Sequence, residues 1–148
     1  MKKLFLLIIP ILLYGCSHDM NRREIDEINI VHVIGIDYLD GEFIISVLYS
    51  SDGGADSEES GVSSEEEIIS GTGRTPYEAL EDVKFKNKKN ITLAHTGSFL
   101  IGEGAASQDI SLCLDFISRD ETIKMESLFY VTKGIDAKEF MKESLEEK

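Results

Sequence analysis

The stretch that decides the fold is residues 28–49, INIVHVIGIDYLDGEFIISVLY. Its first half is dominated by β-branched residues that alternate imperfectly up to Tyr38, which favours a strand with one well-buried face. Residues 38–42 (YLDGE) then supply an Asp-Gly turn, and strand character resumes over residues 43–49. Two strand-like runs about such a turn predict an antiparallel β-hairpin.

The rest of the chain alternates between strand-like and helix-like segments. Residues 75–78 (TPYE) form a capping box with proline at the first helical position, which predicts a helix that runs to about Lys89. Further helices are expected over residues 108–118 and from residue 136, and further strands at 66–73, 98–101 and 125–132. This order predicts an α+β domain, with a mixed β-sheet that starts with the hairpin and about three helices packed on one face.

Residues 51–65 are rich in glycine, serine and acidic residues. Such a segment cannot bury enough apolar surface to offset the entropy of ordering it, so it predicts a flexible acidic loop. Clustered carboxylates could instead hold calcium. Asp52, Asp56 and Glu58 lack the regular ligand spacing and the closing glutamate of an EF-hand, so the spacing favours the loop.

The first sixteen residues, MKKLFLLIIPILLYGC, read as a unit separate from the fold. Two lysines precede a short apolar run that cannot cross a bilayer but is typical of a secretory signal. Residues 13–16 (LYGC) resemble a bacterial lipobox, in which the cysteine receives a lipid; an ordinary secreted protein is the alternative. The sequence therefore predicts a signal peptide over 1–15, a tether over 16–26 lipidated at Cys16, and a single domain over 27–148.

Composition limits the partners of the chain. With 28 acidic against 15 basic residues, its formal net charge is −13. Nucleic acids and anionic lipid surfaces attract lysine and arginine, so neither is an expected partner, and the lipid at Cys16 must supply membrane attachment. If Cys16 carries lipid, Cys113 has no partner for a disulfide and is expected to be a small buried hydrophobe.

Few residues suggest catalysis. His95 could be a ligand or a general base, but no second ligand lies at a matching spacing, and a structural role is favoured. The lysines that end the helix after residue 75 could form a partner site, although they also match the helix dipole. No P-loop, dinucleotide-binding glycines, catalytic triad or metal cluster is present. We therefore expect a protein that is not an enzyme and that holds no cofactor or metal.

Five stretches, in order behind the lipobox, carry a resemblance to a known family. They are residues 16–25 (CSHDMNRREI), residues 33–37 (VIGID), Thr75 with residues 78–80 (EAL), residues 93–95 (LAH) with 100–103 (LIGE), and residues 116–120 (FISRD). Together they resemble the N-terminal domain of the spore germination Ger(x)C family, the lipoprotein C subunits of nutrient germinant receptors.

The resemblance implies a function. It implies an accessory subunit without catalytic activity, on the outer face of the spore inner membrane, that assembles with the integral-membrane A and B subunits of the receptor. Family members continue into further domains, so it also implies that a chain ending at Lys148 is a truncated or split gene product or a stand-alone remnant. A lipid-anchored extracytoplasmic protein that binds a small solute is the alternative function.

Overall fold

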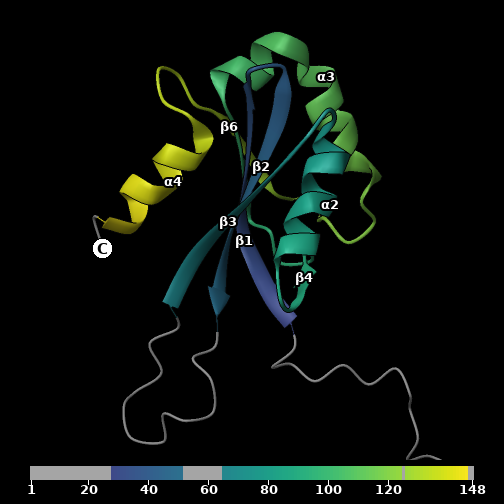
Figure 1. Ribbon diagram of the computed structural model, residues 1–148, viewed down its shortest axis with the longest axis vertical. Helices are drawn as coiled ribbons and strands as arrows, with labels where there is room; N and C mark the ends of the chain where they lie inside the picture. Colours follow the sequence, from purple (N-terminus) through teal and green to yellow (C-terminus); the bar gives the residue numbers. More distant parts are fainter. Residues whose placement is uncertain (1–27, 52–64, 125, 147–148) are drawn as a thin grey trace, which may run out of the picture.

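The computed structural model describes residues 28–51, 65–124 and 126–146 (Figure 1). Within them the chain forms six strands and three helices, which confirms the α+β class. In chain order they are β1 (Ile28–Leu39), β2 (Glu42–Ser51), β3 (Glu65–Gly73), α2 (Pro76–Lys86), β4 (Asn90–Thr92), β5 (Ser98–Ile101), α3 (Glu103–Arg119), β6 (Leu128–Val131) and α4 (Ala137–Glu146).

The strands form one mixed sheet in the order β3-β2-β1-β5-β6, and β4 pairs with the start of β1. The pairs β1–β2 and β2–β3 are antiparallel, whereas β1–β4, β1–β5 and β5–β6 are parallel. β1 is therefore the central strand. β3 and β6 form the two edges.

The opening hairpin is confirmed in detail. Leu39 pairs with Glu42, so the turn consists of Asp40 and Gly41 alone. Both have positive φ, 53° and 89°, as a type I′ turn requires. The Asp-Gly sequence thus fixes the register in which β1 and β2 pair.

The larger core lies on the face of the sheet that α2 and α3 cover. Apolar side chains of both helices pack there against alternate residues of the central strands, in a cluster that contains Ile34, Ile45, Leu80, Phe99 and Phe116. α2 ends at Lys86, earlier than expected. α3 begins earlier than expected and has a kink at Asp109, whose carboxylate accepts a hydrogen bond from the Leu112 amide at 3.1 Å.

The expectation that all three helices cover one face is wrong for α4. This helix packs on the opposite face, where a smaller cluster joins Ala137 and Met141 to Leu48 and Leu100 (Figure 1). The central strand β1 is therefore buried on both faces, which is the physical reason for its imperfect alternation. The apolar stripe of α4 indicates that the helix packs on something but carries no information about which face it covers.

Candidate docking surface

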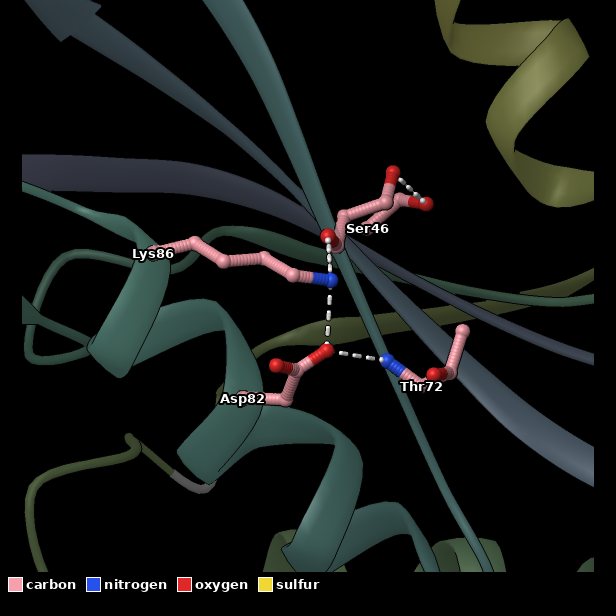
Figure 2. Close-up of polar contacts among 5 residues, drawn as sticks. Ser46, Thr72, Asp82 and Lys86 are labelled. Atoms are coloured by element: carbon pink, nitrogen blue, oxygen red, sulfur yellow. Dashed lines mark hydrogen bonds and ion pairs between the residues drawn. The ribbon is translucent and has the colours of Figure 1, made fainter.

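The β3 edge of the sheet is closed by side chains of α2. On the outer side of β3, the Thr72 amide donates to the Asp82 carboxylate at 2.9 Å, and the Lys86 ammonium donates to the Ser70 carbonyl at 3.3 Å. Asp82 and Lys86 also pair with each other at 2.6 Å (Figure 2). Because of these hydrogen bonds, the pKa of Asp82 lies below its ordinary value, with the contact to Lys86 as the largest cause.

The β6 edge differs from the β3 edge in its side chains, which are apolar or aromatic and exposed. Its four residues are all apolar or aromatic and all about half exposed: Leu128 at 56%, Phe129 at 47%, Tyr130 at 50% and Val131 at 57%. No charged side chain lies within this strand. Exposed apolar side chains that gather at one sheet edge make this edge a candidate interaction site.

No other strand of the described residues pairs with the outer side of β6, so its backbone presents hydrogen-bonding groups there. The amides of Leu128 and Thr132 donate to Gly97 and Ile101, each at 2.9 Å, so these residues face β5. Alternate residues of a strand point to opposite sides, so Phe129 and Val131 direct their amide and carbonyl groups away from the sheet. A free row of such groups is a template on which another strand can pair.

α4 is fixed beside this edge by a carboxylate from the other end of the sequence. Asp37, at 5% exposure near the end of β1, accepts hydrogen bonds from the amides of Ala137 at 2.8 Å and Lys138 at 3.1 Å. The first amides of a helix have no partner within the helix. Asp37 therefore acts as the cap of α4.

Two glycines make room for this arrangement. A Cβ atom on Gly35 would lie 2.8 Å from the terminal methyl group of Met141, so α4 lies directly on the backbone of β1. A Cβ atom on Gly102 would overlap the Asp37 carboxylate. Burial raises the pKa of Asp37 above its ordinary value, although the two amide hydrogen bonds lower it in part.

Between α4 and the β5–β6 side of the sheet lies an open groove of about 510 Å³. Its floor and walls are mainly apolar and include Val33, Leu48, Leu100, Tyr130, Phe140 and Met141. The groove and the β6 edge share Tyr130 and Val131. Together they form a continuous surface, which we call the docking surface.

The residues that the sequence suggested for chemistry do not come together. His95 is exposed and lines a shallow depression with Lys124 and Glu126, away from the groove. Cys113 is fully buried, as expected, and burial raises the pKa of its thiol to about 11. Among the described residues, no group of three or more histidine, cysteine or acidic side chains could hold a metal ion.

Other predicted residues lie outside the described part of the chain. These are Cys16 with the signal peptide and tether, and the acidic residues of the loop between β2 and β3. The helix-end lysines Lys84 and Lys86 pair with Glu81 and Asp82 of their own helix. The docking surface itself was not predicted, although the uncharged run at residues 128–131 (LFYV) was a signal for it.

The fold is that of a small α+β domain with an exposed apolar sheet edge and a groove beside it. No helix in the described ranges is long and apolar enough to span a membrane. A family model described as "Spore germination protein N-terminal domain" matches residues 21–148. The chain therefore belongs to the spore germination Ger(x)C family and corresponds to its N-terminal domain.

Neither a curated protein nor a solved structure matches this chain significantly. The family match sets the chain in the context of a germinant receptor and of association with the spore membrane. The Gly-Ile-Asp motif at residues 35–37, on which the resemblance partly rested, now has a structural role. It provides both the close contact with α4 and the carboxylate that caps it.

Proposed function

We propose that this protein is a membrane-anchored, non-catalytic subunit of a spore nutrient germinant receptor. The observation that carries the proposal is the family match over nearly all of the chain beyond the signal-like segment. In this proposal Cys16 carries the lipid and holds the domain on the extracytoplasmic face of the spore inner membrane. Two or more acyl chains make such an anchor stable, whereas one alone does not.

The docking surface supports a role in assembly. We propose that the β6 edge contacts the integral-membrane A and B subunits of the receptor. Aromatic residues are enriched where proteins bind one another, and β6 exposes two of them, Phe129 and Tyr130, on opposite faces of the sheet edge. An edge strand with free backbone groups suits a partner that adds a strand of its own.

The assembly proposal is tested by recovering receptor subunits with the tagged full-length protein from sporulating cells. Tyr130→Lys places a charge on the docking surface without removing a buried group, and we expect it to reduce recovery of the A and B subunits at least about fivefold. Phe85→Lys is the matched control, because Phe85 is 89% exposed on α2, away from the docking surface. Equal recovery with both variants would contradict the proposed contact.

The anchor is tested separately. Cys16→Ala should move the protein out of the membrane fraction and abolish incorporation of labelled palmitate. A Cys113→Ala variant controls for acylation elsewhere, since this thiol is buried in the core. Retention of the Cys16→Ala variant in the membrane, with unchanged labelling, would show that the lipid is not attached at this cysteine.

A further inference from the structure

The groove beside α4 has the size and the composition of a ligand site. Its volume of about 510 Å³ falls within the range of about 300–1,000 Å³ that is usual for small-molecule pockets. Such pockets are lined mainly by apolar and aromatic side chains, with a few polar groups that fix the orientation of the ligand. Leu100, Phe140 and Met141 supply the apolar part here.

The charge of the groove is opposite to that of the protein. Although the chain carries a formal net charge of −13, no aspartate or glutamate lines the groove. The one charged residue in the lining is Lys133, in the loop between β6 and α4. Among the ion pairs formed by described residues, none involves Lys133. Its ammonium is therefore available to an anion that enters the groove.

We propose that this groove binds an organic monocarboxylate with an apolar body. The body lies against Leu100 and Phe140, and the carboxylate pairs with Lys133. The lining has no carboxylate that could receive an ammonium group, so a free α-amino acid would leave its positive charge without a partner. The expected preference is therefore for a simple anion over a zwitterion of similar size.

Three naphthalene compounds that carry an anionic, a neutral or a cationic substituent test whether the groove selects an anion and disfavours an ammonium group. They are 2-naphthoate, the neutral 2-naphthylmethanol and the cationic 2-naphthylmethylamine, titrated against the full-length protein in lipid nanodiscs and followed by fluorescence anisotropy. The chain contains no tryptophan, so the protein does not mask naphthalene emission. Nanodiscs without protein give the contribution from partition into lipid, which is subtracted.

Matched variants locate the site. Lys133→Gln should weaken 2-naphthoate binding about threefold to fivefold, the effect of losing one exposed ion pair, and should leave the neutral compound unaffected. Lys142→Gln removes the same charge from an α4 residue that does not line the groove. Ser144→Phe partly fills the groove and should abolish binding, whereas Glu143→Phe adds the same ring to a neighbouring position outside the lining.

The outcomes separate the proposal from its competitors. Saturable binding of 2-naphthoate that is lost in Ser144→Phe and weakened in Lys133→Gln supports it. Equal binding of all three compounds, or binding that Ser144→Phe leaves intact, overturns it. Failure of 2-naphthoate to bind, as expected if a protein segment occupies the groove, also overturns it. None of these results depends on recovery of the receptor subunits, so this proposal and the proposed function can fail independently.

Discussion

The two edges of the sheet, β3 and β6, differ in whether their outward backbone groups are bonded. At β3, outward backbone groups are bonded by Asp82 and Lys86 of α2, and the strand begins with three consecutive glutamates. At β6, no such helix side chain bonds the outer side within the described residues, and four apolar side chains stand about half exposed. Proteins normally protect sheet edges against unwanted pairing. We interpret the difference as closure of the β3 edge for stability and, in line with the proposed function, an open β6 edge that receives a partner.

The β3 edge is closed because α2 packs directly on the backbone of β3. We therefore expect the largest loss of stability from a substitution that pushes α2 away from this strand. In Gly71→Ala the new Cβ atom would lie 2.6 Å from the Val83 amide nitrogen and would overlap the Ala79 carbonyl oxygen. These are backbone atoms that cannot rotate away, so α2 must shift. We expect the free energy of unfolding to fall by about 3 kcal/mol, measured by urea denaturation.

Gly97→Ala is the matched control for this loss. It introduces the same methyl group, but the nearest atom, the His32 carbonyl oxygen, would lie 3.9 Å away. Its unfolding free energy should stay within about 0.5 kcal/mol of the original protein. If both variants were equally stable, close packing of α2 would not be what closes the β3 edge.

Near the open edge, the largest effect is expected at Asp37. Asp37→Ala leaves the buried amide of Ala137 and the amide of Lys138 without their acceptor, which should cost about 2 kcal/mol. α4 should then exchange amide hydrogens faster than α2. Asp115→Ala, which removes an exposed carboxylate paired with Arg119, is the control and should change stability by less than about 0.5 kcal/mol.

The features that could be predicted from the sequence are those that depend on residues close together in the chain. The Asp-Gly turn of the first hairpin and the start of α2 were both foreseeable, and the Glu78 amide donates to the Thr75 hydroxyl at 3.2 Å as expected. The Glu78 carboxylate departs from the usual capping box, in which it would accept from the amide of the N-cap residue, because it accepts from the Arg74 amide. Such features arise within a few residues, where local geometry leaves few alternatives.

What the sequence did not predict depends on residues far apart in the chain. Asp37 caps α4 across 100 positions, and no local pattern specifies that partner or the face that α4 covers. The three-residue strand β4 was missed because it is too short to show a periodicity of its own. The open edge was missed for a related reason: residues 128–131 read as a strand, but only the strand order shows that no other described strand pairs with their outer side.

Asp82 should make a smaller contribution at the closed edge. Asp82→Ala removes the acceptor for the Thr72 amide and the partner of Lys86, at a cost of about 1 kcal/mol. A double-mutant cycle with Lys86→Met should assign about half of this to the ion pair. A coupling energy of zero would mean that Lys86 closes the edge only through the Ser70 carbonyl.

The two carboxylates should respond to pH in opposite directions. The pKa of Asp82 is lowered in the folded state. Its contribution to the free energy of unfolding is therefore present when the pH is above the ordinary pKa of 3.8, and it is lost as the pH falls through the pKa of the folded state. The pKa of Asp37 is raised, so its contribution is full below 3.8 and is lost as the pH rises through the folded value.

Asparagine variants measure these responses. On acidification from pH 7 to pH 4, the stability advantage of the original protein over Asp37→Asn should rise. Its advantage over Asp82→Asn should begin to fall only at still lower pH. The same direction of change for both variants would contradict the assigned pKa shifts.

The smallest effect on stability is expected at the open edge itself. Val131→Lys replaces a half-exposed side chain at a residue whose amide and carbonyl groups face away from the sheet. The free energy of unfolding should therefore change by less than about 0.5 kcal/mol. Recovery of the receptor subunits should nevertheless fall. A loss of more than about 1 kcal/mol would mean that the exposed residues of β6 serve the fold, as Asp82 and Lys86 do at β3. Unchanged stability with lost binding is the combination expected only of a surface that exists for a partner, because folding then gains little from the residues that binding requires.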